Sequence, residues 1–361
     1  MRPSHALVAD DRLTYREALF ESMDGALAAH PHSIIIGQGV TDHKGIFGTT
    51  TGLAARYGPE RVIETPLAEE AITGVCLGAA LNGLYPINTH IRADFSLLAF
   101  NHLINLAAKY RYMFGGLFAV PMLVRMVIGR SWGQGAQHSQ SLQSLFAHIP
   151  GLTVIMPSTP STILASYDWA VREHRGPVIS LEHRLMYELA FDSTGWNASA
   201  GATPFASRRV REGSDVTVVA TSIMVLEAMR AAEHLAQHGI DCEVIDLHCV
   251  SHPDKAMILD SLARTRRLVV ADTSWVPFGV AAEVCRIVAE SDPTLLSAPV
   301  VTLGMQPSPC PTSKALEDLF YPDLAELTAA IAGLVRGDAH AVPLPSHQSM
   351  TDFYKSFKGP F

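Results

Sequence analysis

The stretch TPLAEEAITGVCLGAALNGL, residues 65–84, says most about how this chain folds. Glu69 and Glu70 precede a run of small and apolar residues, which predicts a helix that begins with a carboxylate pair. A helix so poor in polar residues is expected to be buried, so its first turn sets acidic groups at the edge of a core, where their ionisation can be tuned. Acidic first turns are also common because they suit the helix dipole, and the stretch alone does not separate these interpretations.

Strands and helices alternate on both sides of this stretch. The pattern predicts a helix over residues 13–29, a long helix from about Phe95 to Tyr112 and a helix after Pro157. Buried strands are expected at residues 33–37, 85–90, 121–126, 152–156 and 178–181. Such alternation is typical of a mostly parallel sheet that helices cover on both faces.

A second block repeats the alternation after a polar segment that contains several glycines. Its expected strands are residues 215–220, 242–247, 267–272 and 299–303, and its expected helices are residues 225–238, 253–265, 280–290 and 324–335. The fold class is therefore α/β, with two doubly wound domains. The expected boundaries are domain 1–187, linker 188–214, domain 215–337 and an extended tail 338–361.

Composition limits the possible functions. The chain has 361 residues, 48% of them hydrophobic and 17% charged, and a formal net charge of -8. This acidic balance argues against nucleic-acid binding, and no apolar run is long enough to span a membrane. The N-terminus lacks an apolar signal core, and the five cysteines form no C-x-x-C pair. We therefore expect a cytoplasmic protein with reduced, buried thiols.

A glycine-rich loop, GRSWGQGAQHSQ at residues 129–140, follows an expected strand and contains His138. Loops at the carboxyl ends of parallel strands are where open α/β sheets bind ligands. A histidine there can carry a proton or hold an anionic substrate. It can equally cap the helix expected near Ser139, and the residues leave both interpretations open.

The other histidines give weaker signals. His248 and His252 are four residues apart, but they follow a strand and precede Pro253, so a solvated loop is expected and no metal ligands are assigned. His90 and His102 lie on apolar segments and are expected to be core or interface residues. Neither block contains a G-x-G-x-x-G or G-x-x-x-x-G-K-[ST] loop, so neither offers a phosphate cradle of its own.

Several motifs together resemble a known family. They are T-P-[IL]-x-E before the small-residue helix, A-A-K-x-x-Y-M-x-G-G at residues 107–116, x-H-S-Q at the loop end and W-x-x-F-G-V-x-A-E at residues 275–283. The chain resembles the β subunit of the thiamine-diphosphate-dependent, decarboxylating first component of 2-oxo acid dehydrogenase complexes. More broadly, it is similar to the transketolase-like pyrimidine-binding and C-terminal domains, from about Leu13 to Leu334.

The resemblance implies roles for four residues. Glu69, rather than Glu70, matches the glutamate that hydrogen-bonds the aminopyrimidine ring and favours the imino tautomer that deprotonates the thiazolium carbon. Phe95 and Ile91 match apolar residues against that ring. His138 matches a histidine that faces the reacting carbon. The implied catalytic residues are Glu69 and His138, and the implied cofactor-binding residues are Glu69, Ile91 and Phe95.

The resemblance also implies partners. The G-D-G…N segment that holds the diphosphate and Mg²⁺ is missing here, and in the family it lies on the α subunit. Thiamine diphosphate would thus be shared with an α subunit, in an α2β2 assembly that uses a 2-oxo acid and passes the acyl group to a lipoyl-bearing acyltransferase. The family's potassium segment is changed at residues 171–177, so bound potassium is not expected, and His248 stands where the family commonly has arginine.

Two other functions remain open from the sequence. A split transketolase-like or acyloin-forming carboligase would use the same cofactor with a carbonyl acceptor. A catalytically idle scaffolding subunit would keep the fold without the chemistry, although the retained Glu69, Phe95 and His138 argue against it.

Overall fold

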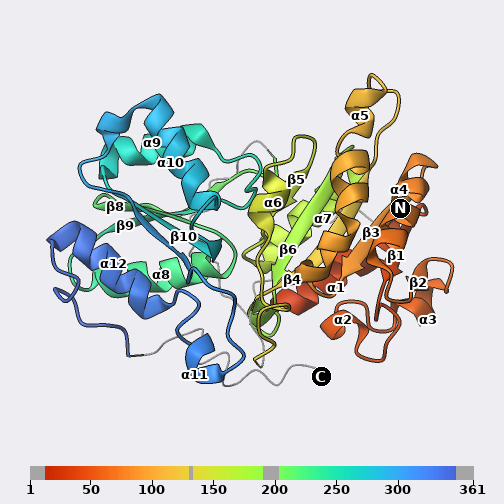
Figure 1. The fold of residues 1–361 in the computed structure, drawn as a ribbon, viewed down its shortest axis with the longest axis horizontal. Coiled ribbons are helices and arrows are strands. Elements are labelled where there is room, and N and C mark those ends of the chain that lie inside the picture. Colours follow the sequence, from red (N-terminus) through yellow and green to blue (C-terminus); the bar gives the residue numbers. More distant parts are fainter. Residues whose placement is uncertain (1–12, 130–132, 190–202, 347–361) are drawn as a thin grey trace.

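The structure, a computed structural model, describes residues 13–129, 133–189 and 203–346, which fold into two α/β lobes that lie side by side (Figure 1). The expected fold class is confirmed. The sheet of the first lobe has the order β2-β1-β3-β4-β6-β5, and every pair in it is parallel. Its strands are β1 (Ser33–Gly37), β2 (Val62–Glu64), β3 (Tyr85–His90), β4 (Met122–Ile128), β5 (Thr153–Ile155) and β6 (Pro177–His183).

Helices cover both faces of this sheet. On one face α1 (Tyr15–Ala29) packs against α7 (Pro160–Arg172), and both begin with a capping box, at Thr14 and Thr159. On the other face lie α4 (Glu69–Leu81), η1 (Ala93–Ala99) and η2 (Asn101–Ala107). Shorter helices are α2 (Gly45–Gly48), α3 (Leu53–Tyr57), α5 (Tyr110–Met113), α6 (Gln143–Ala147) and η3 (Arg184–Met186).

The second lobe contains a mixed sheet of order β11-β10-β8-β9-β7, in which β7 is antiparallel to β9. Its strands are β7 (Arg208–Arg211), β8 (Val216–Ala220), β9 (Cys242–Asp246), β10 (Leu268–Trp275) and β11 (Val301–Met305). Helices α8 (Ile223–Ala236) and α12 (Leu324–Arg336) cover one face, and α9 (Lys255–Thr265) and α10 (Val280–Ser291) cover the other (Figure 1). Two short helices complete the lobe, η4 (Pro293–Leu295) and α11 (Lys314–Glu317).

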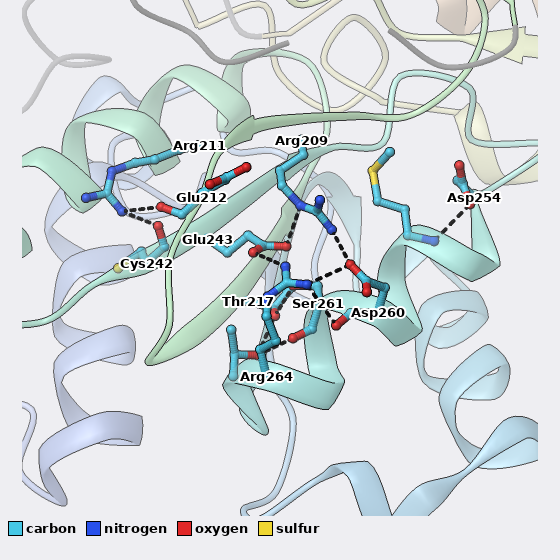
Figure 2. A network of polar contacts seen from close by, with 12 residues as sticks. Arg209, Arg211, Glu212, Thr217, Cys242, Glu243, Asp254, Asp260, Ser261 and Arg264 are labelled. Carbon is cyan, nitrogen blue, oxygen red and sulfur yellow. Dashed lines mark hydrogen bonds and ion pairs between the residues drawn. The ribbon is translucent and has the colours of Figure 1, made fainter. Parts of the chain in front are cut away.

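Strand β7 lies inside the segment that the sequence indicates as a linker. A buried carboxylate on the neighbouring strand, Glu243, helps to hold it in place (Figure 2). Arg209 of β7 donates to Glu243 at 2.8 Å and to Asp260 of α9 at 2.6 Å, and Arg264 of α9 donates to the second Glu243 oxygen at 2.6 Å. The charge network therefore ties the edge strand to the helix behind it.

The two lobes meet along a continuous seam. Ile155 of β5 forms an antiparallel bridge with Cys249, and Val250 N–H donates to the Val154 carbonyl at 2.9 Å. Ser158 donates to the buried Asp246 carboxylate at 2.6 Å across the same seam. Each of the two apolar core layers contains residues of both lobes, so burial is shared across the seam rather than confined to either side.

The structure corrects the long helix expected from about Phe95 to Tyr112. That segment is divided into the 3-10 helix η1, the π-helix η2 and the short α5. Ser96 Oγ donates to the Ala93 carbonyl at 2.5 Å and thereby competes with the helical backbone ladder. Buried positions still recur at three- and four-residue intervals, which explains why the sequence pattern is that of one helix.

Helix α4 also differs from expectation, because it is only half buried in this chain. Thr73, Cys76 and Leu77 face the core, whereas Val75 is 55% exposed. The small residues still serve close packing: a Cβ added at Gly74 would lie 2.8 Å from His102 Nε2 of η2. In the described part of the chain, no helix is long and apolar enough to cross a membrane.

Candidate active site

A pocket of about 350 Å³ lies at the carboxyl ends of the strands of the first sheet. Its wall includes Gly37 at the end of β1, residues 88–92 at the end of β3, and Arg184 directly after β6. The segment 65–69, Phe95, Gln134 and His138 complete it. This is the edge at which parallel α/β sheets usually bind ligands.

All four site residues expected from the sequence line this pocket: Glu69, Ile91, Phe95 and His138. Glu69 is the first residue of α4 and is half-buried, whereas Glu70 is exposed and does not line the pocket. Among the described residues, none donates a hydrogen bond to the Glu69 carboxylate, so it is available to a ligand. This placement favours a role in the pocket over the interpretation that Glu69 only suits the helix dipole.

The rings of Phe95 and His138 contact each other in the wall of the pocket. Their centroids are 5.1 Å apart and the ring planes meet at 77°, an edge-to-face contact. His138 N–H lies 3.4 Å from the Gly135 carbonyl, within the glycine-rich loop. The loop thus brings a titratable ring against an apolar one, about 40 residues away in sequence.

His90 is a pocket residue that the sequence did not reveal, since it was expected to be a core or interface histidine. It is the last residue of β3, and burial lowers its pKa to about 4. Its Nε2 lies 3.2 Å from Asn88 Nδ2, while its buried Nδ1 has no hydrogen-bond partner among the described residues. Thr89 Oγ1 and Thr65 Oγ1 are buried and unpartnered in the same way. These buried atoms are therefore available to form hydrogen bonds with a bound molecule.

Two arginines of the pocket were also missed. Arg92 follows β3 and Arg184 follows β6, and both are buried. Arg92 donates to the Gly129 carbonyl at 3.0 Å and to Gln134 Oε1. The Arg184 guanidinium lies over the Phe47 ring, 4.3 Å from its centroid. The sequence does place each arginine within two residues of the end of a buried strand, but it does not show that these two strand ends meet at one pocket.

Phe47 reaches the pocket from a strained loop. Ile46 and Phe47 have φ angles of 41° and 57°, in the left-handed region that side chains rarely adopt. The nearby Thr49 hydroxyl accepts hydrogen bonds from Arg125 at 3.2 Å, which helps to hold this loop against the sheet.

Arg125 belongs to a buried ion pair with Glu182 beneath the site. Both side chains are at most 1% exposed, and the two nitrogens donate to the two carboxylate oxygens at 2.7 and 2.8 Å. Tyr167 and Tyr187 donate to the same carboxylate at 2.5 and 2.6 Å. Because both carboxylate oxygens are bonded, the pair is compensated for its burial, and it helps to orient Tyr187, whose ring contacts that of Phe47.

His248 does not line the pocket, and the prediction that it lies in a solvated loop is wrong. The side chain is fully buried at the lobe seam, where its Nε2 lies 2.9 Å from Ser166 Oγ. The His248 side chain therefore contacts other residues of this same chain. Among the described residues, no cluster of three or more potential metal ligands occurs.

Comparisons with known proteins agree with this architecture. The profile of the transketolase pyrimidine binding domain matches residues 11–189, and that of the transketolase C-terminal domain matches residues 206–327. The "Split gene transketolase, inactive beta4 tetramer" superposes with a TM-score of 0.73 at 22% identity, over 90% of this chain and 99% of that one. Transketolase from Campylobacter jejuni gives 0.66 at 13% identity, over 91% and 47%. At these identities the structures support the fold alone.

Closer relatives are found among curated sequences. The pyruvate dehydrogenase E1 component subunit beta-2, mitochondrial, of Oryza sativa subsp. japonica is 36% identical over 95% of this chain and 93% of its own length. The acetoin:2,6-dichlorophenolindophenol oxidoreductase subunit beta of Cupriavidus necator is 35% identical over 91% and 99%. The pyruvate dehydrogenase E1 component subunit beta of Rickettsia conorii is 35% identical over 89% and 97%.

Proposed function

This chain belongs to the family of β subunits of thiamine-diphosphate-dependent 2-oxo acid dehydrogenases, and on that premise we propose that its pocket holds the aminopyrimidine ring of the cofactor. The observation that carries the proposal is that Glu69, Ile91, Phe95 and His138, which come from three segments of the chain, line one pocket. The protein then decarboxylates a 2-oxo acid together with an α subunit. The acyl group passes to a lipoyl group of an acyltransferase.

The residues present fit that ring. The Glu69 carboxyl can hydrogen-bond a ring nitrogen, because no described residue makes a hydrogen bond to it, and Phe95 offers an apolar face in the same pocket. The unpartnered Thr89 Oγ1 and His90 Nδ1 supply further polar contacts. When bound, thiamine diphosphate supplies a carbon nucleophile that stabilises the negative charge left by decarboxylation.

Each residue has one task in this proposal. Glu69 holds and exchanges a proton at the pyrimidine nitrogen, which tunes the basicity of the amine on the ring. Phe95 and Ile91 orient the ring and exclude water. His138, in edge contact with Phe95, faces the reacting centre, where an imidazole can donate or accept a proton near neutral pH.

The cofactor's charged end requires a partner chain. The sequence lacks a phosphate-binding loop, and the described residues offer no cluster of three metal ligands. Several large apolar side chains of the first lobe are exposed: Leu67 at the pocket at 81%, Val75 of α4 at 55% and Leu117 before β4 at 84%. An α subunit that carries the diphosphate and Mg²⁺ site, in an α2β2 assembly, would cover such surfaces.

Two further expectations complete the proposal. The changed segment at residues 171–177 argues against bound potassium. The expected compartment is the cytoplasm, although the rice relative is named mitochondrial, and fractionation of the source cells checks it.

The complex of this chain with the α subunit that copurifies with it tests the function. With thiamine diphosphate and Mg²⁺, it should reduce an artificial electron acceptor when a 2-oxo acid is added, whereas the separate chain should not. The two components measured alone are the controls. Turnover by the separate chain at the rate of the complex, or a complex that is silent on every 2-oxo acid, would contradict the proposal.

A further inference from the structure

The loop that carries His138 is in contact with the second lobe. Gly133 and Gly135 lie against Thr312, which belongs to the loop between β11 and α11. A Cβ added at Gly135 would lie 2.6 Å from Thr312 Oγ1, and one added at Gly133 would overlap the Thr312 carbonyl oxygen. Both glycines also have φ angles in the left-handed region, 63° and 69°. Glycine at these two positions therefore allows the loops of the two lobes to approach each other closely.

A second contact with the same lobe directly follows His138. Tyr321 Oη donates to the Ser139 carbonyl at 3.4 Å, and the Tyr321 side chain is buried. The next residue, Gln140, is held by the first lobe, because its backbone N–H and its side-chain amide donate to the Asp94 carboxylate at 3.1 and 2.9 Å. The second lobe therefore contacts the loop on both sides of His138.

The loop that bears Thr312 is itself anchored within the second lobe. The Gln306 N–H donates to the Phe320 carbonyl at 2.9 Å. The indole N–H of Trp275, the last residue of β10, donates to the Ser308 carbonyl at 3.0 Å. These bonds hold the surface against which the two glycines lie.

The imidazole of His138 has few other contacts that determine its position. Its ring meets the Phe95 ring edge to face, with 5.1 Å between the centroids. Among the described residues, none forms a hydrogen bond with the imidazole nitrogens. The position of the ring therefore follows the position of its loop. Proton transfer requires hydrogen-bond reach, so a displacement of about 1 Å is enough to cost on the order of 100-fold in rate.

We propose that Thr312 and Tyr321 of the second lobe are positioning residues for His138, an inference that rests on the proton-transfer role proposed for His138 above. Among the described residues that line the pocket, none belongs to the second lobe. The first lobe thus supplies the wall for the cofactor ring, and the second lobe fixes the imidazole that faces the reacting centre. Changes at these contacts should lower kcat and leave the affinity for the cofactor unchanged.

The main test combines Gly135→Ala and Thr312→Ala, singly and together, in the α–β complex. Gly135→Ala should lower kcat about 10- to 100-fold, because the added methyl group pushes the loop away from Thr312 Oγ1. Thr312→Ala keeps the backbone contact with Gly133 and should lower kcat by about 2- to 10-fold. In the double variant the methyl group fills the space that Oγ1 leaves, with Cβ of residue 312 at 3.7 Å, so its kcat should lie within about 3-fold of that of Thr312→Ala.

Gly52→Ala is the matched control for backbone strain. Gly52 has a φ angle of 78°, but a Cβ there would meet no atom within 4 Å, so this variant should keep the wild-type kcat. A double variant whose loss equals the product of the two single losses would overturn the inference, because strain at residue 135 rather than contact with Thr312 would then explain the effect.

Tyr321→Phe tests the second contact, because it removes the O–H that donates to Ser139. It should lower kcat while the Kd for thiamine diphosphate, measured by calorimetry on the complex, stays at the wild-type value. A Kd that rises as much as kcat falls would contradict a positioning role, since the whole pocket would then be disturbed.

A structural measurement separates this inference from the proposed function. In crystals of the complex, the distance of 5.1 Å between the Phe95 and His138 rings should change by about 1 Å or more in Gly135→Ala and return in the double variant. This result stands even if His138→Ala keeps full turnover, in which case the catalytic role of His138 fails and its positioning by the second lobe does not. An imidazole that stays in place in Gly135→Ala would overturn the inference at any level of activity.

Discussion

Glu69 and Glu70 carry the same functional group at adjacent positions of α4, yet only Glu69 lines the pocket. The helix rotates each successive residue by about 100°, so a single step moves a carboxylate from the cavity to solvent. This contrast makes the two residues a matched pair for testing whether charge at the pocket, rather than charge on the helix, matters.

Glu69→Gln should lower the turnover of the α–β complex by about 10²- to 10⁴-fold, because an amide cannot exchange a proton with the cofactor ring. The direct measurement is the rate of deuterium exchange at the reactive carbon of the bound cofactor. Glu70→Gln is the control and should exchange at the wild-type rate. Equal rates in both variants would remove Glu69 from the proposed chemistry.

The sequence revealed some residues of the site and concealed others. Glu69, Phe95 and His138 lie in or near motifs that match those of the family in type and spacing, so they could be proposed from the sequence. His90, Arg92 and Arg184 could not, because their role depends on which strand ends meet in space. A histidine at the end of an apolar strand is interpreted as a core residue as long as the neighbouring strands are unknown.

At the scale of the element, the edge strand β7 depends on the buried Glu243 (Figure 2). Glu243→Gln removes the charge that two arginines share, and we expect the free energy of unfolding to fall by about 1–3 kcal/mol. The loss stays moderate because Arg209 and Arg264 are 19% and 44% exposed and can be solvated. Urea unfolding of the chain measures it.

Asp168→Asn supplies the matched control for this network. Asp168 pairs with Arg172 on the exposed face of α7, with both side chains about half exposed. Such surface pairs contribute about 0.5 kcal/mol or less. Equal losses in the free energy of unfolding for the two variants would show that burial does not make the Glu243 network more stabilising than a surface pair.

Regular elements could be predicted from their periodicity, and irregular ones could not. Apart from the three-residue β2 and the edge strand β7, the strands of both lobes lie where the apolar pattern indicates, as do helices α1, α4, α7, α8, α9, α10 and α12, because burial on one face imposes that pattern. Strand β7 is short and its half-buried positions carry arginines, so its sequence is polar, and its pairing with β9 cannot be read from it. Residues 93–107 pack against α4, and this contact between separate segments is not visible in a local pattern.

At the scale of the molecule, the seam between the lobes contains titratable groups with opposite pH effects. Burial lowers the pKa of His248 to about 3 and raises the pKa of Asp246 to about 6, and Arg208 faces both. The unfolded chain binds the histidine proton from about pH 6.5 downward, so His248 costs stability as the pH falls. Folded Asp246 holds its proton below about pH 6, so it adds stability as the pH falls toward 4.

Variants at the seam should separate these two effects. Between pH 7 and 4.5 the melting temperature of His248→Asn should fall less than that of wild type, and that of Asp246→Asn should fall more. His90, whose pKa burial also lowers, contributes alike to every variant. Thermal unfolding at half-unit pH steps gives the slopes, each compared with the same protein at pH 7. Parallel slopes in all three proteins would contradict this assignment.

The bridge between Ile155 and Cys249 has a consequence for how substrate reaches the pocket. Backbone pairing and common apolar layers join the lobes, so a hinge movement that opened them apart would have to break these contacts. Access must then be governed by whatever docks over the mouth at Leu67 and by the side chains that rim it. The α subunit would then control access to the pocket in addition to completing the cofactor site.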